Sequence, residues 1–234
     1  MNEKIYPLKL GITTSYLIKG EKDFLLIDTG YTGDYPKFRR GLSKIGVLPE
    51  EISWLLLTHH HDDHAGFASR LVEETGCRLI VHRDALDPLS RGVSLENMEP
   101  VNQCVRMSFG LFELFHGKFN YPPLHVSGEN SVIVEEDTEL PEETGINGKI
   151  IMTPGHCSDS ISLLLESGEA FVGDAAMNFL NFCRIHYRPI YIENRKKVFL
   201  SWEKILDRGS RVIYPAHGKP FPADRLARSL KRFG

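Results

Sequence analysis

The sequence predicts a single domain of the α/β class over residues 1–234. Short apolar runs bounded by turn residues recur along the chain, which is typical of strands. Longer stretches with apolar residues at helical spacing separate several of these runs. Between Trp54 and His82 the order is strand, loop, helix, strand, as in a βαβ unit. A chain of 234 residues is long enough to bury a substantial core.

The first elements are predicted by two apolar runs and the turn between them. Ser15–Lys19 and Phe24–Asp28 flank the polar sequence G-E-K-D, so they are expected to pair as a hairpin. The sequence D-T-G, which begins at Asp28, then predicts a sharp turn out of the second strand. A helix is expected over Tyr35–Gly46, because its apolar residues recur at helical spacing and Gly46 suits its C-terminal end.

The middle of the chain continues this alternation. Trp54–Thr58 is a short continuous apolar run, as expected of a strand buried on both faces. Phe67–Glu74 is predicted to be helical, and Arg78–His82 is predicted to be the next strand. The segment 87–130 is longer and rich in aromatic residues, especially over Phe109–Tyr121. Two interpretations stay open for it: helices that belong to the core, or an inserted lid over a functional site.

The second half of the chain returns to short strands separated by turns. Strands are expected at Ser131–Val134, Lys149–Thr153, Ser160–Leu165, Ala170–Val172 and Val212–Tyr214. Lys196–Leu206 carries its apolar residues on one helical face, and Ala223–Phe233 is expected to form a closing helix.

Composition narrows the class of partner. Hydrophobic residues make up 41% and charged residues 25%, and the formal net charge is −3. This balance gives no support for a nucleic-acid surface, so the expected partner is a small-molecule substrate, while the oligomeric state stays open. No apolar run approaches the roughly 18 residues of a membrane span. The N-terminal stretch is too polar for a signal peptide.

Cysteine usage indicates a reducing compartment. The cysteines are widely scattered, with no C-x-x-C motif, at Cys77, Cys104, Cys157 and Cys183. Together with the polar N-terminal stretch, this pattern predicts reduced thiols and a cytoplasmic location.

The densest chemical signal follows the strand expected at Trp54–Thr58. The sequence H-H-H-D-D-H places four of the ten histidines within positions 59–64. Residues two apart on an extended chain point the same way, so His59 and His61 can bind one cation. Asp63 and His64 begin the next turn and can face a second cation nearby. Because imidazole nitrogens are good zinc ligands, this stretch predicts a metal site.

Further ligands must come from distant parts of the chain, because one loop cannot surround an ion. Three candidates follow apolar strands beside a glycine: His156 in T-P-G-H, Asp174 in V-G-D and His217 in P-A-H-G. Residues at strand ends beside glycine can reach the rim of a sheet without obstruction. An aspartate can bridge two ions, since each of its oxygens can bind one.

These motifs resemble the metallo-β-lactamase superfamily. The sequence T-H-H-H-D-D-H at Thr58–His64 fits the signature T-H-x-H-x-D-H of that superfamily. The order of D-T-G, P-G-H, G-D and a final H-G also fits, so the resemblance extends from about Tyr16 to Gly218. It implies a four-layer αββα sandwich, in which helices cover the outer sides of two central sheets.

The resemblance also implies a dinuclear metal site. One metal would take His59, His61 and His156, the other would take Asp63, His64 and His217, and Asp174 would bridge them. Asp28, in the D-T-G turn, resembles the aspartate that supports the loops of the site. The expected cofactors are two Zn²⁺ ions, with iron or manganese as other metals that such ligands accept.

The activity implied by the resemblance is that of a metal-dependent hydrolase. A hydroxide activated by two metals would cleave a small carbonyl ester, lactone or thioester. Asp63 would be the catalytic residue that orients the nucleophile and passes a proton to the leaving group. The aromatic segment would favour an apolar acyl group if it forms a lid.

Alternatives to each of these roles stay open. An iron-dependent oxidoreductase of the persulfide dioxygenase type has a similar fold but uses a single iron. The presence of all three expected ligands of a second metal, Asp63, His64 and His217, argues against this alternative. A phosphodiesterase, a β-lactamase and a non-catalytic metal-stabilised module are weaker alternatives. Cys157 occupies a position where the family often has threonine. Its thiol could be a spectator, a redox-sensitive group or an extra metal ligand. His186, Tyr187 and Tyr191 could reach the site as oxyanion donors, although packing is the simpler explanation for them.

Overall fold

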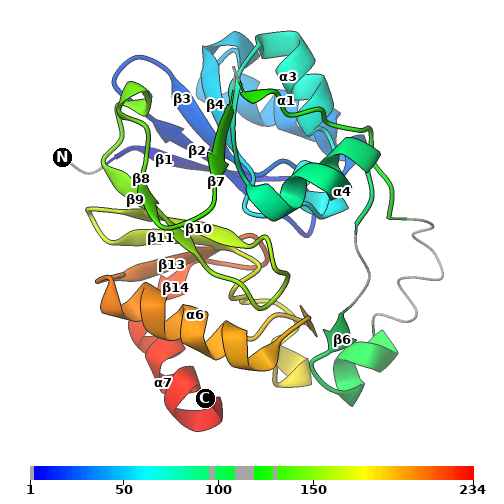
Figure 1. The fold of residues 1–234 in the computed structure, drawn as a ribbon, viewed down its shortest axis with the longest axis vertical. Helices are drawn as coiled ribbons and strands as arrows, with labels where there is room; N and C mark the ends of the chain where they lie inside the picture. Colours follow the sequence, from blue (N-terminus) through cyan, green and yellow to red (C-terminus); the bar gives the residue numbers. More distant parts are fainter. Residues whose placement is uncertain (1–2, 95–97, 109–118, 129–130) are drawn as a thin grey trace.

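Four layers make up the molecule. A computed structural model describes residues 3–94, 98–108, 119–128 and 131–234. Two six-stranded sheets face each other in the middle of the molecule, and helices cover the outer side of each (Figure 1). In that view the blue and cyan helices lie at the top, and the orange and red helices of the C-terminal end lie at the bottom. This arrangement confirms the αββα sandwich.

The first sheet is built by the N-terminal half of the chain in the order β1-β2-β3-β4-β5-β7. Its strands are β1 (Ile5–Lys9), β2 (Thr14–Lys19), β3 (Phe24–Ile27), β4 (Ile52–Leu56), β5 (Arg78–His82) and β7 (Ser131–Val134). Strands β3, β4, β5 and β7 run parallel, so crossover connections are required. Helices α1 (Tyr35–Ile45) and α3 (Ala68–Thr75) provide two of them.

Strand β1 is absent from the sequence-based prediction. Pro7 lies in its middle, opposite Tyr16 of β2. A proline cannot donate a backbone hydrogen bond, so it argues against a strand inside a sheet. β1 is the outermost strand of the first sheet, where one edge needs no partner. The proline therefore marks an edge strand rather than the absence of one.

The second sheet comes from the C-terminal half, in the order β14-β13-β11-β10-β9-β8. Its strands are β8 (Thr138–Glu139), β9 (Gly148–Met152), β10 (Ile161–Leu165), β11 (Glu169–Gly173), β13 (Val212–Pro215) and β14 (Phe221–Pro222). Helices α6 (Arg195–Asp207) and α7 (Ala223–Phe233) pack on its outer face. The predicted strands and helices of this half agree with these bounds to within one or two residues.

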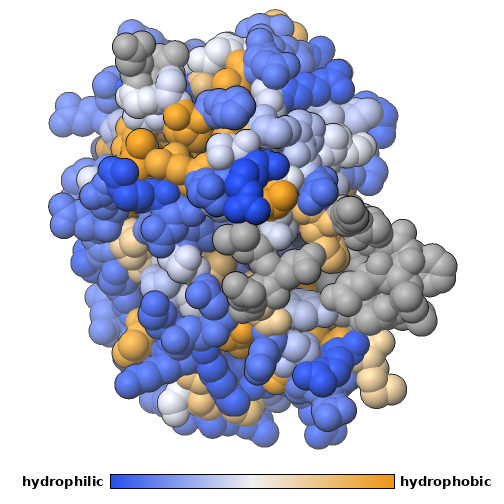
Figure 2. Space-filling model, turned by 45° about the vertical axis from the view of Figure 1, so that its right-hand side comes forward, coloured by the Kyte–Doolittle hydropathy of each residue, from blue (hydrophilic) through white to orange (hydrophobic). Residues whose placement is uncertain are grey.

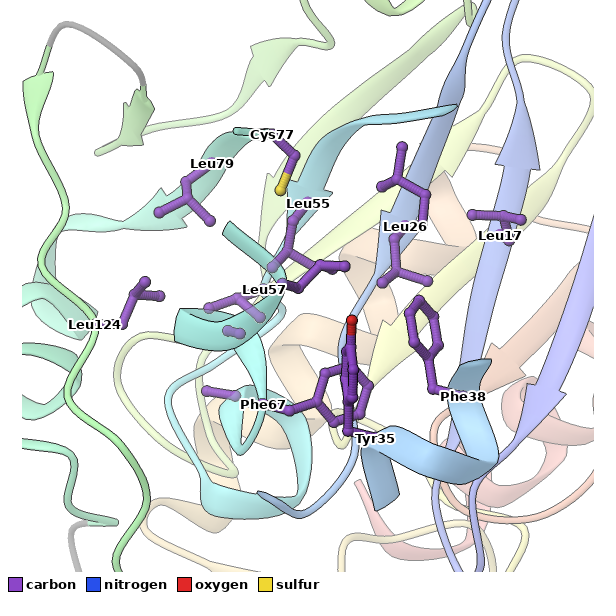
Figure 3. Close-up of a cluster of buried hydrophobic side chains, with 14 of the residues drawn as sticks. Leu17, Leu26, Tyr35, Phe38, Leu55, Leu57, Phe67, Cys77, Leu79 and Leu124 are labelled. Atoms are coloured by element: carbon purple, nitrogen blue, oxygen red, sulfur yellow. The ribbon is translucent and has the colours of Figure 1, made fainter. Parts of the chain in front are cut away.

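Three apolar cores hold the layers together. Between the first sheet and its helices, Tyr35, Phe38 and Phe67 form an aromatic cluster, with the rings of Phe38 and Phe67 5.1 Å apart (Figure 3). Between the sheets, strand side chains such as Trp54 pack against the facing sheet. Under α6 and α7, the side chain of Trp202 is fully buried. Burial on both faces explains why the strands read as continuous apolar runs.

The segment 87–130, predicted as core helices or a lid, is described in part. It includes most of α4 (Leu86–Arg91), β6 (Glu99–Pro100) and a helical stretch at 103–108. Strand β6 pairs with β12 (Tyr191–Ile192) from the C-terminal half. Most of the aromatic run Phe109–Tyr121 lies outside the described residues. The lid therefore stays a prediction.

The remaining elements are short. Helix α2 (Asp62–Ala65) follows β4. Single 3-10 turns lie at Thr32–Asp34, Pro49–Glu51, Arg83–Ala85, Glu142–Thr144 and Asn181–Cys183.

The expectation that all cysteines are reduced is wrong for one pair. Cys104 and Cys183 form a disulfide, with their Cα atoms 5.4 Å apart. Cys77 and Cys157 are buried free thiols. The bonded pair is separated by 79 positions in the sequence, and it meets only because 103–108 folds against the loop after β11. No spacing motif could reveal this contact.

The surface is mostly polar on the face that Figure 2 shows, with apolar residues gathered in a band at its upper left. Among the residues that the structure describes, no helix has the length and apolar character needed to cross a bilayer.

Candidate metal centre

The ends of several strands meet at one edge of the sandwich. The residues predicted as ligands follow the carboxyl ends of β4 in the first half and of β9, β11 and β13 in the second, or lie in the short helix α2. Backbone contacts join the two halves here: Ile161 N donates to Thr58 O at 2.9 Å, and Thr14 N donates to Ala216 O at 2.8 Å. Loops that are distant in sequence are thereby brought around one point.

Three histidine nitrogens converge on one side of this point. His61 Nδ1 lies 3.0 Å from His59 Nε2 and 3.1 Å from His156 Nε2. All three rings are buried. The structure thus brings together the three histidines expected to hold the first metal.

A second group of side chains lies beside the first. His217 Nε2 is 3.0 Å from Asp63 Oδ2, and His64 Nε2 is 3.6 Å from Asp63 Oδ1. His64 is fully buried, whereas the side chain of Asp63 is 13% exposed. Asp63 is the most exposed of the seven expected ligands.

Asp174 lies between the two groups. Its Oδ2 is 3.5 Å from His156 Nε2, in the first group. Its Oδ1 is 3.4 Å from both His64 Nε2 and His217 Nε2, in the second group. Each oxygen therefore faces a different set of histidines.

Backbone carbonyls hold two of the histidine rings in place from behind. His156 Nδ1 lies 2.8 Å from Tyr191 O, and His217 Nδ1 lies 3.1 Å from Ile12 O. A carbonyl only accepts hydrogen bonds, so each Nδ1 carries the hydrogen. In the neutral ring the lone pair then sits on Nε2, which points into the site. This arrangement is typical of histidines that bind metals.

Asp28 supports the same loops, as the family resemblance implied. Its Oδ1 accepts from Thr58 N at 2.7 Å, and its Oδ2 accepts from Thr58 Oγ1 at 2.7 Å. Oδ2 also lies 2.8 Å from His64 Nδ1. Asp28 therefore orients His64 and fixes the start of the histidine loop without reaching the site itself.

The polar atoms of these side chains cannot all satisfy one another by hydrogen bonds, whereas bound cations would satisfy them. His61 Nδ1 has a single hydrogen or a single lone pair, so it cannot bond both nitrogens that lie near 3 Å from it. His64 Nε2 and Asp174 Oδ1 are buried and have no hydrogen-bond partner in the described structure. A buried polar atom without a partner costs about 1–3 kcal/mol. Two cations would satisfy all of these atoms.

Grouping by distance adds Cys157 to the first set and also connects the two sets. The ligand atoms of His59, His61, His156 and Cys157 lie within 4.8 Å of one another, as do those of Asp63, His64 and His217 and those of His59, His64 and Asp174. The spacing is compatible with one ion in each set.

Electrostatics differ between the two sets. Burial lowers the pKa of His59 and His61 well below the usual range, and nearby histidines lower it further. Burial also lowers the pKa of His156, against the opposing effect of Asp174. These rings are neutral at pH 7, which is the form that binds a metal.

The second set is charged. Burial acts to lower the pKa of His217. The carboxylates of Asp174 and Asp63 have the larger effect and raise the pKa of His217 to about 10. Burial likewise opposes the charge on His64, and Asp63, Asp174 and Asp28 raise its pKa well above the usual range. Burial raises the pKa of Asp63 and Asp174, but their histidine neighbours lower it below the usual range. Both carboxylates are therefore ionised.

Gly173 allows the close approach of the two sheets at this edge. It has φ +50°, and a Cβ there would lie 2.3 Å from Thr58 Oγ1. Thr58 is the residue that Asp28 holds. The glycine of V-G-D is thus required both by its conformation and by its contact.

Sequence reasoning missed the partner of His60. His60 Nδ1 lies 2.9 Å from Asp159 Oδ2, and His60 N donates to the same oxygen at 2.9 Å. Both side chains are buried. The contact fixes the middle of the histidine loop. One sequence signal pointed to it: Asp159 lies three positions after His156, in the loop expected to meet the site.

Cys157 is a buried thiol beside the first set. Its Sγ lies 3.1 Å from Ser160 Oγ, and burial raises its pKa well above the usual range. His186 and Tyr187 instead pack on the C-terminal part, with Tyr187 stacked on Phe221 at 4.2 Å. Tyr191 supports the site through its backbone carbonyl, which lies behind His156.

Comparison with known proteins agrees with this arrangement. A family model described as the metallo-beta-lactamase superfamily matches residues 8–217. A beta-lactamase-like protein 2 homolog of Drosophila melanogaster is 27% identical over 88% of this chain, which spans 58% of that protein. A probable metallo-hydrolase of Methanocaldococcus jannaschii is 27% identical, over 94% of this chain and 93% of that protein.

Two further relatives bear on chemistry and fold. An atrochrysone carboxyl ACP thioesterase of Aspergillus fumigatus is 23% identical over 90% of this chain, which covers 52% of that protein. Among solved structures, an archaeal superfamily protein from Sulfolobus tokodaii aligns with a TM-score of 0.68 at 19% identity. That alignment covers 99% of this chain and 86% of the other, and it shows the shared fold.

Proposed function

Because the chain belongs to the metallo-beta-lactamase superfamily, we propose that it is a hydrolase that holds two divalent cations, zinc foremost, and cleaves a small ester, lactone or thioester. Members of the superfamily are in general metal-dependent hydrolases. The observation that carries the proposal is the position of Asp174, with one oxygen toward each set of histidines.

The proposed ligands are those expected from the motifs. His59, His61 and His156 would hold one cation, and Asp63, His64 and His217 the other, with Asp174 between them. When bound, a pair of zinc ions supplies Lewis acidity and lowers the pKa of water toward about 7. Histidine-rich ligand sets favour zinc over magnesium or calcium.

Asp63 is the proposed catalytic residue. Its carboxylate accepts a hydrogen bond from Thr13 Oγ1 at 3.2 Å and contacts His217, which keeps it oriented and ionised. It is also the proposed ligand that solvent reaches most, with 13% of its side chain exposed. An ionised carboxylate at that position can take a proton from an attacking water and return it to the leaving oxygen or sulfur.

The proposed substrate class is an acyl compound with a modest apolar part. Phe179 packs against His217 with ring centroids 5.9 Å apart, so an apolar wall borders the second set. The fungal relative named as a thioesterase supports a thioester or ester carbonyl as the group attacked. Tyr31 adds a phenol near Asp63, where burial and the carboxylates raise its pKa and keep it protonated.

A substrate panel on a pair of neighbouring variants tests this proposal. Protein depleted of metal and reloaded with zinc would be assayed on lactone, thioester, phosphodiester and β-lactam substrates. Activity is expected on the lactone or thioester and is expected to fall at least a hundredfold in Asp63→Asn. Asp62→Asn is the matched control, because Asp62 is the neighbouring aspartate outside the proposed ligand set and its Oδ1 accepts from Ser94 Oγ. Equal activity of both variants with wild type would contradict the assignment.

Metal content separates this function from an iron-dependent oxidoreductase. About two zinc ions per chain support the hydrolase. One iron per chain, together with oxygen consumption on a persulfide, would instead support the dioxygenase.

A further inference from the structure

A cavity lies on the C-terminal side of the molecule, and it shares no residue with the metal centre. It has a volume of about 320 Å³ and lies between helix α7, red in Figure 1, and the loop that follows β11. Three arginines of α7, Arg225, Arg228 and Arg232, line one side. His186 and Tyr187 of the loop line the other.

The charge of this cavity is opposite to that of the whole chain. The three arginines are three and four positions apart, so they share one face of α7. Arg228 pairs with Asp224 at 3.1 Å, whereas Arg225 and Arg232 form no ion pair within the described part of the chain. Like charges on one helix face repel each other. All three arginines are exposed to solvent, so an anionic ligand that enters the cavity can reach them.

Two more arginines add to the positive field. Arg188 lies over the ring of Phe233 at 4.7 Å, and Phe233 also lines the cavity. Burial lowers the pKa of His186, and Arg232, Arg188 and Arg184 lower it further. His186 is therefore neutral at pH 7 and can offer a hydrogen bond without adding to the repulsion.

The loop that faces the arginines is held in an unusual conformation. Arg184, His186 and Tyr187 all have left-handed φ values, between 52° and 67°. A non-glycine residue keeps such an unfavourable conformation only where surrounding contacts enforce it. Here Ser229 Oγ donates to His186 O, and the ring of His186 packs against the ring of Phe233 with centroids 4.8 Å apart. The cavity wall is thus preformed rather than loose.

We propose that this cavity binds a small organic phosphate through its phosphoryl group. Guanidinium groups bind phosphate oxygens in pairs, and a cluster of them suits a dianion better than a single carboxylate. The rings of His186, Tyr187 and Phe233 provide an apolar wall for the rest of the ligand. The cluster spans only two turns of one helix, which matches a small molecule rather than the repeated phosphates of a nucleic acid.

The position of the cavity links it to the metal centre without overlap. The same loop begins after Asp174 and ends at Tyr191, whose carbonyl accepts from His156 Nδ1 at 2.8 Å. In its middle, Met177 N donates to Tyr187 O at 2.9 Å. The proposed phosphate site therefore lies on the loop that connects the proposed ligand Asp174 with Tyr191, the support of His156, although binding to it requires no metal.

Calorimetric titration of the full chain tests this proposal independently of hydrolysis. The probes are AMP, inorganic phosphate and adenosine. AMP is expected to bind more tightly than phosphate, and adenosine is expected not to bind. The double variant Arg225→Gln/Arg232→Gln is expected to weaken AMP binding at least tenfold. Lys231→Gln removes a like charge from the same helix outside the cavity and is expected to change binding less than twofold.

The opposite results would overturn the proposal. These are absence of AMP binding by the wild type, equal binding by the double variant, or an equal loss in Lys231→Gln, which would indicate general charge attraction. If inorganic phosphate binds as tightly as AMP, the proposal of an organic ligand is contradicted, and free phosphate is the ligand of the cavity. Thermal melting checks that the variants fold. If the double variant does not fold, the single variant Arg232→Gln takes its place.

Discussion

The carboxylate of Asp28 and the imidazole of His64 are both buried, with Oδ2 and Nδ1 2.8 Å apart. Asp28 also accepts two hydrogen bonds from Thr58, the residue before the histidine loop. One side chain thus fixes both the orientation of a proposed ligand and the path of the loop. Its backbone has φ 56°, a conformation that asparagine also tolerates.

Asp28→Asn is expected to weaken metal binding while leaving the fold intact. An amide has one oxygen, so it cannot accept from Thr58 and His64 together as the carboxylate does. Loss of such a support typically weakens metal affinity about 10–100-fold. Competition with a chromogenic chelator measures the change. Asp34→Asn is the control, because this buried aspartate of the next turn pairs with Lys37 instead. Unchanged affinity in Asp28→Asn would contradict the supporting role.

Gly173→Ala is expected to destabilise the chain more than a glycine substitution at an open position. Its new Cβ would meet Thr58 at 2.3 Å in addition to the strain of φ +50°. Gly76→Ala isolates the strain, because Gly76 has φ +69° and an added methyl there would meet no atom within 4 Å. Overpacking typically costs about 1–3 kcal/mol, so urea unfolding should show that difference between the two variants. Equal losses would mean that the contact with Thr58 is unimportant.

The pairing of Asp137 makes part of the stability dependent on pH. Its carboxylate accepts from Lys204 Nζ at 2.7 Å, from Met152 N at 2.9 Å and from Arg208 at 2.9 Å. Burial raises the pKa of Asp137, but these donors outweigh it and lower the pKa below its usual value. The stabilisation is therefore complete above the unfolded pKa of about 3.9 and is lost as pH falls through the lower folded value.

Asp137→Asn should consequently lower the free energy of unfolding at pH 7 by up to about 1 kcal/mol, since the group is partly screened by solvent. The gap to wild type should close as the pH is lowered below 4. Urea midpoints at several pH values measure it, with Glu136→Gln, an exposed neighbour, as the control. A gap that persists unchanged at low pH would exclude the ion pairs as its cause.

The disulfide predicts a defined response to reductant. Cross-links over loops of this length typically contribute about 2–4 kcal/mol. Cys104→Ser should therefore melt at a lower temperature than wild type, and reductant should lower the wild type to the same point without affecting the variant. Thiol titration of unfolded, unreduced protein should find two free thiols, Cys77 and Cys157. Four titratable thiols would show that the bond does not form in solution.

Much of the fold was accessible from the sequence because of its local signals. Apolar runs such as Trp54–Thr58 end at turn residues, and burial on both faces of the sheets leaves little ambiguity about the strands. The residues proposed as ligands could be picked out because most of them stand just after such strands. Pro7 concealed β1, since only the completed sheet shows that this strand lies at an edge.

The contacts that support the site were not accessible in the same way. The pairing of His60 with Asp159, the carbonyl of Tyr191 behind His156, and the disulfide all join residues that are far apart in the chain. Beyond the closeness of Asp159 to His156 in the sequence, no local pattern marks these contacts. They follow from tertiary packing, which sequence periodicity does not specify.

Anomalous diffraction from crystals of the zinc-loaded protein tests the central claim most directly. We expect two peaks per chain, one among His59, His61 and His156 and one among Asp63, His64 and His217, with Asp174 between them. A single peak, or zinc bound away from these residues, would contradict the dinuclear centre.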